Sequence, residues 1–281
     1  MLLEIIKFLI YSALIVIVSK FVLVKYLRKL AENLNLNAKT IGNIAGLATS
    51  TPELLTISTS SIRGLYGTSV YNILSSNIIN LIQYTVTIII NKNMEKLKNK
   101  AIKTDIILVI TTIIIPIILL ILNVELSVSV VPLFVILYIF FKYLNSNAHK
   151  LYLNKEDKQI LEDIENEEKN LIKNKKKTVR YCVILLITGI LLFIIGELLG
   201  NSLENLCNIF NVSQNLIGIL LGFITSIPEL ITFFESQKHH KSKENEMLGV
   251  VEATNNLLTS NTLNLFLIQS IAIVLMLIFN R

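Results

Sequence analysis

The stretch Thr49-Ser50-Thr51-Pro52-Glu53 lies inside an apolar segment, and a second version of it occurs later as Thr225-Ser226-Ile227-Pro228-Glu229. Each version places hydroxyl groups and one carboxylate beside a proline. A polar segment follows each version, with Asn72, Ser76, Asn77 and Asn80 after the first and Asn256, Ser260, Asn261 and Asn264 after the second. We predict that these four stretches meet near the middle of a membrane and form one cation site.

The composition indicates an all-α, polytopic membrane protein. Hydrophobic residues make up 53% of the 281 residues, the mean hydropathy is +0.64, and the apolar runs are longer than a soluble core needs. The first run, Ile5 to Val24, has no small-residue cleavage site, so we expect it to be a retained span. Cys182 and Cys207 match neither a disulfide framework nor a metal-ligand spacing.

The apolar runs predict about eight transmembrane helices. They are expected at Ile5–Val24, Ala38–Ile62, Thr68–Ile90, Thr104–Leu122, Leu126–Phe141, Val179–Leu199, Gln214–Glu235 and Leu248–Phe279. The fourth and fifth are nearly pure hydrocarbon and are expected to act as scaffold. The charged stretch between the fifth and sixth is too polar to cross a bilayer, and we expect a solvated connector there, with a regulatory role as the alternative.

Basic residues predict the orientation. Most of the 26 lysines and arginines fall in the connections after spans one, three, five and seven, while the opposite side keeps little beyond Lys7, Arg63 and Arg281. Because positively charged connections stay in the cytoplasm, we expect both termini outside, the connector inside, and a location in the cell membrane.

An internal repeat divides the chain. We expect a first repeat at 1–144 with about five helices, a cytoplasmic connector at 145–178, and a second repeat at 179–281 with about three. Gly42, Gly46, Thr49, Ser50, Pro52, Glu53 and Thr56 correspond to Gly218, Gly222, Thr225, Ser226, Pro228, Glu229 and Thr232. An odd number of spans separates the copies, so they should run in opposite directions. Inverted repeats of this kind usually hold substrate at their interface.

The spacing inside each motif brings oxygen atoms onto one helix face. Thr49 and Ser50 lie four and three residues before Glu53. Pro52 lacks an amide hydrogen, which frees the carbonyl of Ala48, and Pro228 does the same for Ile224. Ser76 with Asn80, and Ser260 with Asn264, are also four residues apart. The alternatives are an ordinary proline kink for the motif and helix-to-helix hydrogen bonding for the serines and asparagines.

The two glutamates favour a hard cation. No lysine or arginine lies in the middle of the four polar spans, and two buried carboxylates would repel each other. Carboxylate, hydroxyl, amide and backbone oxygens suit Ca²⁺ or Na⁺ better than Zn²⁺ or Cu⁺. Two negative charges balance one Ca²⁺ or two monovalent ions.

These motifs, with Asn72-x-x-Ser75-Ser76-Asn77-x-x-Asn80 and its copy, resemble the α-repeats of the sodium/calcium exchangers in the cation/Ca²⁺ exchanger superfamily. The resemblance implies an alternating-access antiporter that exports Ca²⁺ in exchange for Na⁺, or alternatively H⁺. By this resemblance Thr49, Glu53, Thr225 and Glu229 would hold Ca²⁺. Monovalent-ion sites would be completed by Ser50, Ser76, Asn80, Ser226, Ser260 and Asn264, with the carbonyls of Ala48 and Ile224.

The sequence departs from the family pattern in three places. Na⁺-coupled prokaryotic members commonly have an aspartate at one of the positions that match Asn80 and Asn264, so the coupling ion and stoichiometry stay open. Ser75 and Thr259 replace a glycine. The second repeat is expected to lack the last two of the family's ten helices. Glu252 is an additional acid, which we expect to be solvated near the cytoplasmic mouth.

Other functions compete with antiport. A passive cation channel would use the same oxygens, and a degenerate exchanger would bind ions without transporting them. An enzyme is not expected, because His149, His239 and His240 are predicted in loops and no nucleophile–base pair is present. No cofactor is expected beyond the transported ions. The expected partners are the lipid bilayer, Ca²⁺ and Na⁺ or H⁺, and no nucleic acid; a homo-oligomer stays open.

Overall fold

The structure is a computed structural model that describes residues 2–34, 36, 38–121, 127–151, 175–210, 213–241 and 246–279. Across these ranges the chain is almost entirely helical and contains no β-strand. The prediction of an all-α fold is therefore confirmed. The connector predicted at 145–178 lies largely outside the described residues.

The first half of the chain runs from a long helix through a broken pair to an apolar hairpin. Its elements are α1 (Leu2–Val18), the π-helix η1 (Ser19–Val24), α2 (Lys25–Asn33), α3 (Ala38–Thr49), α4 (Thr51–Ile62), α5 (Tyr66–Ile90), the 3₁₀-helix η2 (Met94–Lys98), α6 (Lys100–Ile121), η3 (Val128–Val130) and α7 (Val131–Leu151).

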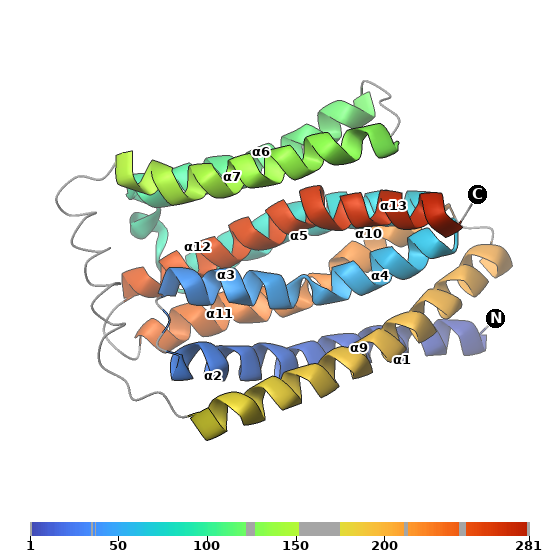
Figure 1. Ribbon diagram of the computed structural model, residues 1–281, viewed down its shortest axis with the longest axis horizontal. Coiled ribbons are helices and arrows are strands. Elements are labelled where there is room, and N and C mark those ends of the chain that lie inside the picture. Colours follow the sequence, from blue (N-terminus) through green and yellow to red (C-terminus); the bar gives the residue numbers. More distant parts are fainter. Residues whose placement is uncertain are drawn as a thin grey trace.

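The second half repeats the broken pair. Its elements are α9 (Lys175–Phe210), α10 (Gln214–Thr225), α11 (Ile227–Lys241), α12 (Glu246–Thr262), the π-helix η5 (Leu263–Ile268) and α13 (Gln269–Phe279). Figure 1 shows that α3–α4 and α10–α11 run in opposite directions, as do α5 and α12–α13.

The helices form an inner bundle with cover on two sides (Figure 1). The inner bundle contains α3–α4, α5, α10–α11 and α12–α13. The hairpin α6–α7 packs on the α12–α13 side, and α1–α2 and α9 pack together on the other side. Aromatic contacts join inner bundle and cover, including Phe134 of α7 against Phe266 of η5 with ring centroids 5.9 Å apart.

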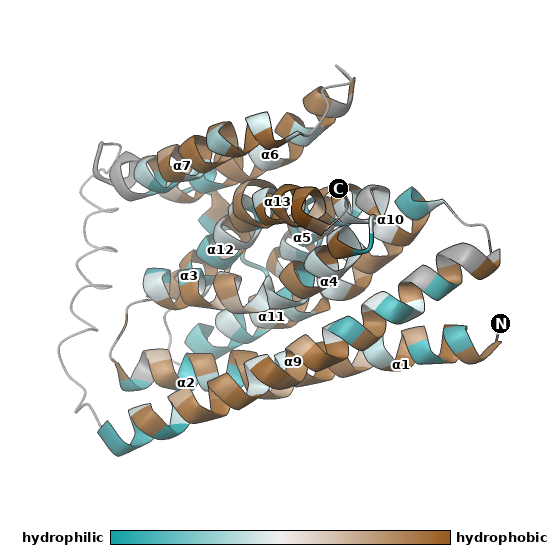
Figure 2. Ribbon diagram, turned by 45° about the vertical axis from the view of Figure 1, so that its right-hand side comes forward, coloured by the Kyte–Doolittle hydropathy of each residue, from teal (hydrophilic) through white to brown (hydrophobic). Residues whose placement is uncertain are grey.

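Seven helical segments in the described part of the chain are long and apolar enough to cross a membrane. They are Leu2–Ala31, Gly67–Ile90, Lys100–Leu119, Val128–Asn145, Lys175–Leu203, Gln214–Lys241 and Glu246–Phe279. The remaining predicted span is the α3–α4 pair. Figure 2 shows that the covering helices α1 and α9 are hydrophobic along most of their length. The chain is an integral, multi-pass membrane protein.

Figure 1 places both termini at one end of the bundle. At the other end lie the junctions α2–α3, α5–α6 and α11–α12, together with the start of α9. We call it the lysine-rich end, since Lys96, Lys103, Lys176 and Lys241 lie in or beside these junctions. Basic residues from several connections thus lie at the end opposite to the termini (Figure 1).

The two broken helices are interrupted at equivalent serines. Ser50 has φ −77° and ψ 0°, and Ser226 has φ −82° and ψ −1°, which is the sparsely populated region between helix and strand. Each break lies two residues before a proline. Pro52 and Pro228 therefore stand in the first turn of α4 and α11, where a missing amide hydrogen costs little.

Glycines let the two halves touch backbone to backbone. A Cβ built on Gly46 of α3 would lie 2.7 Å from the carbonyl oxygen of Asn256 on α12. A Cβ on Gly222 of α10 would lie 2.7 Å from the carbonyl oxygen of Asn72 on α5. Real Cβ atoms do not approach this closely, so only glycine permits these crossings. The helices α3 and α10 thus each pack on a helix of the other half.

Two sequence predictions at the lysine-rich end are wrong. Lys25 and Arg28, expected in a loop, lie on helix α2, which continues α1 through the π-helix η1. His240, also expected in a loop, lies on α11 and is buried. In both places the helix continues beyond the hydrophobic run, because polar residues extend a helix readily once it emerges from lipid.

Candidate cation-binding site

Two glutamates occupy equivalent places in the broken helices. Glu53 lies in the first turn of α4 and Glu229 in the first turn of α11, and both side chains have 0% exposure. A helix N-terminus favours a nearby negative charge, which partly offsets the cost of burying each carboxylate. The two carboxylates also interact electrostatically with each other.

Glu53 lies near hydroxyl groups of both halves, Thr225 on α10 and Ser76 on α5. Neither carboxylate oxygen has a hydrogen-bond partner among the described residues. The Ser76 hydroxyl instead donates to the Asn72 side-chain oxygen at 3.2 Å and to the Gly222 carbonyl at 3.3 Å.

Glu229 has the corresponding neighbours. Its Oε1 accepts a hydrogen bond from Ser260 at 3.0 Å, and the Thr49 hydroxyl lies near the carboxylate. Ser260 and Ser50 lie 2.8 Å apart between their hydroxyl oxygens. Ser226, the counterpart of Ser50, is fully buried, and its hydroxyl makes no hydrogen bond within the described part of the chain.

Four asparagines connect α5 to α12 and η5. The Asn80 amide donates to the Asn261 side-chain oxygen at 3.1 Å, and the Asn264 amide donates to the Asn77 side-chain oxygen at 3.2 Å. Asn77 and Asn261 each donate to the backbone carbonyl of the other. Each of the four amide nitrogens thus makes a hydrogen bond, whereas the side-chain oxygens of Asn80 and Asn264 have no partner among the described residues.

Two threonines outside the predicted site support it. Thr56 accepts from the Asn72 amide at 3.1 Å, and Thr232 accepts from the Asn256 amide at 2.6 Å. Each threonine donates back to the carbonyl of the motif proline. Their equivalence in the sequence repeat was the signal that could have identified them as part of the site.

Ala48 and Ile224 differ from the other predicted residues because only their carbonyls were expected to contribute. The Ala48 side chain packs in an apolar cluster with Ile15, Leu192 and Leu221. The Ile224 side chain is half-buried. Because Pro52 and Pro228 cannot donate, both carbonyls lack the usual helical partner four residues on.

The other ten predicted residues are all buried: Thr49, Ser50, Glu53, Ser76, Asn80, Thr225, Ser226, Glu229, Ser260 and Asn264. Contacts between the two halves join most of them. Several of their oxygens have no partner in the described part of the chain: both of Glu53, Oε2 of Glu229, and one each of Asn80, Thr225, Ser226 and Asn264. A buried oxygen without a partner costs about 1–3 kcal/mol. A cation bound by these oxygens would remove that cost.

The donor set is made of hard oxygen atoms. In the described ranges no group of three or more His, Cys, Asp or Glu side chains gathers as a metal site, and no lysine or arginine pairs with Glu53 or Glu229. Ca²⁺ takes roughly six to eight oxygen ligands in flexible geometry. The chemistry therefore fits Ca²⁺ and Na⁺ better than a soft transition metal.

Helices broken at mid-length, buried carboxylates beside the breaks, and a surrounding bundle of membrane spans define a cation transporter. The chain matches the family model described as "Sodium/calcium exchanger protein" over residues 5–146 and 180–281. It belongs to that family, as the sequence motifs suggested, and is a transporter rather than an enzyme.

Two solved structures share the fold. The crystal structure of the H⁺/Ca²⁺ exchanger CAX superposes with a TM-score of 0.66 at 16% identity, covering 98% of this chain and 68% of that one. The sodium-calcium exchanger NCX_Mj, soaked with Na⁺ and without Ca²⁺, superposes with a TM-score of 0.56 at 19% identity, covering 98% and 84%. No curated protein matches the chain.

Proposed function

We propose that the protein is a Ca²⁺ antiporter that exports Ca²⁺ in exchange for Na⁺ by alternating access. Glu53 and Glu229, with Thr49 and Thr225, bind Ca²⁺. The oxygens of Ser50, Ser76, Asn80, Ser226, Ser260 and Asn264, with the carbonyls of Ala48 and Ile224, complete the sites for monovalent ions. The observation that carries the proposal is the pair of fully buried carboxylates without a basic partner among the described residues.

Charge balance supports exchange of one Ca²⁺ for two monovalent ions. Two carboxylates carry two negative charges, and either one Ca²⁺ or two monovalent ions would neutralise them fully. A bilayer interior penalises any charge that is left over. The site is therefore occupied alternately by Ca²⁺ and by two monovalent ions, and each transport cycle moves no net charge.

The uncharged oxygens favour Na⁺ as the coupling ion. Protons would need only the two carboxylates. The side-chain oxygens of Asn80, Asn264 and Ser226 are buried without partners in the described part of the chain, and they are ligands that Na⁺ can use and a proton cannot. H⁺ coupling is the alternative, because one of the two solved structures above is that of an H⁺/Ca²⁺ exchanger.

The organisation of the chain supports alternating access. We assign 1–144 and 179–281 as inverted repeats, with 145–178 as the connector between them. The same contact occurs once in each half: Asn72 donates to Thr56 in the first half, and Asn256 donates to Thr232 in the second. By the distribution of lysine and arginine we assign the lysine-rich end to the cytoplasm and both termini to the outside.

The proposal is tested by ⁴⁵Ca²⁺ uptake into proteoliposomes under an outward Na⁺ gradient, with an H⁺ gradient in parallel. We expect Na⁺-driven uptake that Glu53→Gln and Glu229→Gln each abolish. Glu235→Gln is the matched control, because Glu235 lies on α11 but is exposed. If only the H⁺ gradient drives uptake, the coupling ion is H⁺ and not Na⁺. No gradient-driven uptake, or Ca²⁺ current beyond transporter turnover, would contradict antiport.

A further inference from the structure

A buried ion pair lies between the candidate site and the lysine-rich end. One guanidinium nitrogen of Arg28, on α2, contacts both carboxylate oxygens of Glu252, on α12, at 2.9 and 3.1 Å. Ser236 donates to the same carboxylate at 2.6 Å, and His240 Nε2 lies 3.0 Å from it. Glu252 has 2% exposure. The prediction that Glu252 is solvated is therefore wrong, because three side chains take the place of water.

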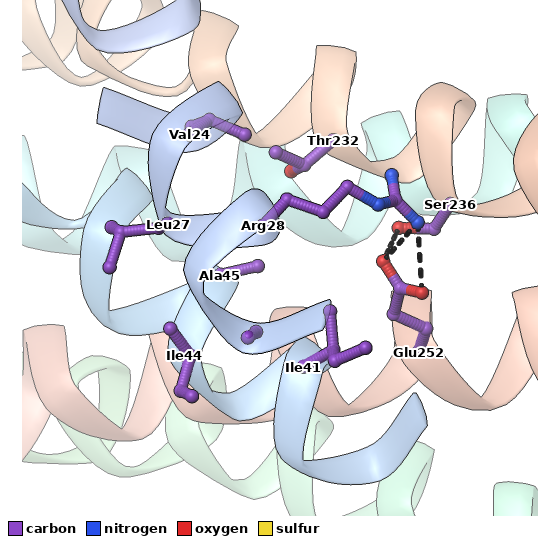
Figure 3. Close-up of a pocket in the computed structure, with 10 residues that line it drawn as sticks. Val24, Leu27, Arg28, Ile41, Ile44, Ala45, Thr232, Ser236 and Glu252 are labelled. Carbon is purple, nitrogen blue, oxygen red and sulfur yellow. Dashed lines mark hydrogen bonds and ion pairs between the residues drawn. The ribbon is translucent and has the colours of Figure 1, made fainter. Parts of the chain in front are cut away.

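The pair borders a narrow pocket that reaches the polar shell of the site. Arg28, Ala45, Thr232, Ser236 and Glu252 are among its lining residues, and Figure 3 shows Arg28 extending from α2 across this pocket to Glu252. Thr232 also accepts from Asn256, whose side-chain oxygen accepts from the site residue Thr49 at 3.4 Å. Thr232, Asn256 and Thr49 thus form a chain of contacts from the pocket to the cation site.

The ion pair ties together two parts of the bundle. Arg28 belongs to α1–α2, which covers the bundle and packs on α9. Glu252 belongs to α12, which packs on α3 and α11 of the inner bundle. Any widening of the space between α2 and α12 must separate these two charges, and a carboxylate buried without its partner is strongly unfavourable.

At the opposite end of the bundle, the positions equivalent to three members of this contact carry no charge. In the sequence repeat Glu252 corresponds to Thr68, Ser236 to Ser60, and His240 to Gly64. Thr68 donates to the backbone carbonyl of Gln214 at 3.1 Å. The acid that accepts from Arg28 at the lysine-rich end is thus replaced by a threonine at the equivalent position of the other half.

We propose that Arg28 and Glu252 form an ion-pair gate that is closed in this structure and controls access to the cation site from the lysine-rich end. Glu252 holds the guanidinium across the pocket, where the Arg28 side chain obstructs the way to the site (Figure 3). Opening this end breaks the pair. Glu252 does not act as a further cation ligand in this state, because both of its oxygens are already engaged. The gate rests on the proposed function.

A thiol-labelling experiment tests the gate without any measurement of flux. Ala45→Cys places a thiol on the pocket, in a background with Cys182→Ser and Cys207→Ser. A membrane-impermeant maleimide is added at the lysine-rich side, in the parent and with Arg28→Gln or Glu252→Gln. We expect labelling at least about threefold faster in both variants, because the open state is more populated. Lys25→Gln, an exposed change on the same helix, should leave the rate unchanged.

Sided transport kinetics separate a gate from a merely structural contact. In vesicles of opposite orientation, a broken gate should lower the KM for Ca²⁺ at the lysine-rich side and raise it at the other side, each by about threefold or more, because apparent affinity follows the population of the competent state. A structural contact would instead lower maximal flux or protein yield and leave the two KM values alike.

The double variant Arg28→Gln/Glu252→Gln guards against misfolding, since it leaves no unpaired buried charge. It should resemble the single variants in labelling and in KM. Unchanged labelling in all three variants, or KM values that move together, would overturn the gate. If the parent protein shows no Ca²⁺ flux, the proposed function fails, while the labelling rates still decide whether this ion pair closes the pocket.

Discussion

Ser50 and Ser260 lie 2.8 Å apart between their hydroxyl oxygens, although one stands at the helix break of the first half and the other on α12 of the second. Ser260 donates its single hydrogen to Glu229, so Ser50 must donate to Ser260. The break in one half is thus connected through a serine to the carboxylate of the other half, and the two motifs form one unit.

Removal of these hydroxyls should weaken Ca²⁺ binding unequally. Ser260→Ala leaves Glu229 without its donor, and hydrogen bonds to charged groups are worth about 1.5–3 kcal/mol, so we expect roughly a tenfold or greater loss of affinity. Ser50→Ala removes a neutral contact and should cost about threefold or less. The double variant should resemble Ser260→Ala. Calorimetric titration with Ca²⁺ measures all three, and Ser127→Ala, on an exposed residue, is the control. Strictly additive losses would mean that the serines act separately.

Ca²⁺ should stabilise the folded protein. A ligand that binds only the native state adds about 2.7 kcal/mol at a concentration a hundred times its Kd, and it would satisfy several buried oxygens at once. We expect the Tm in detergent to rise with Ca²⁺, and to rise less or not at all with Mg²⁺, which tolerates only near-octahedral geometry. Glu53→Gln should remove the Ca²⁺-dependent rise, and Glu235→Gln should keep it. If Ca²⁺ raises the Tm of Glu53→Gln as much as that of the unaltered protein, Ca²⁺ binds at another place in the molecule.

Charge added at the site should change the stoichiometry. The unaltered protein is expected to exchange one Ca²⁺ for two monovalent ions, with a flux that does not respond to membrane potential. Asn264→Asp adds a third carboxylate to the candidate site and should admit a third monovalent ion, which makes the flux respond to a potential set with K⁺ and valinomycin. Asn201→Asp adds the same charge at an exposed position of α9 and should leave the flux insensitive. A voltage-sensitive flux before any substitution would refute the two-for-one exchange.

The glycine contacts should be sensitive to one methyl group. Gly46→Ala and Gly222→Ala would press a Cβ against carbonyl oxygens at 2.7 Å, and overpacking of this kind costs about 1–3 kcal/mol. Gly189→Ala is the matched control, because a Cβ there meets nothing within 4 Å and alanine favours a helix by roughly 0.5–1 kcal/mol. We therefore expect a lower Tm for the first two variants and an equal or higher one for the third. A similar Tm in all three would mean that the helices can separate without cost.

The sequence was sufficient for features that depend on local chemistry. The hydropathy runs predicted the spans because lipid contact demands long apolar segments. Pro52 and Pro228 predicted a lost helical hydrogen bond in each motif, since a missing amide hydrogen acts within a few residues. The structure shows in addition that each helix is interrupted, at Ser50 and Ser226. The repeat pointed to Glu53 and Glu229 as a pair, because it gave two equivalent positions before any contact was known.

Features that depend on long-range contact were missed or misjudged. Arg28 and Glu252 are 224 residues apart in the chain, and no local pattern links them, so the acid at a helix end was expected in water. Asn264 lies in the π-helix η5, whereas its counterpart Asn80 lies in the regular helix α5. The similar sequences around the two asparagines do not reveal that difference.

The crossing of α3 over α12, and of α10 over α5, has a consequence for biogenesis. The ribosome delivers Glu53 to the bilayer long before it has synthesised α12, so the first half must wait with its acid uncovered and its glycine face open. Insertion of α12 therefore covers the glycine face of α3 only after the first half is already in the membrane.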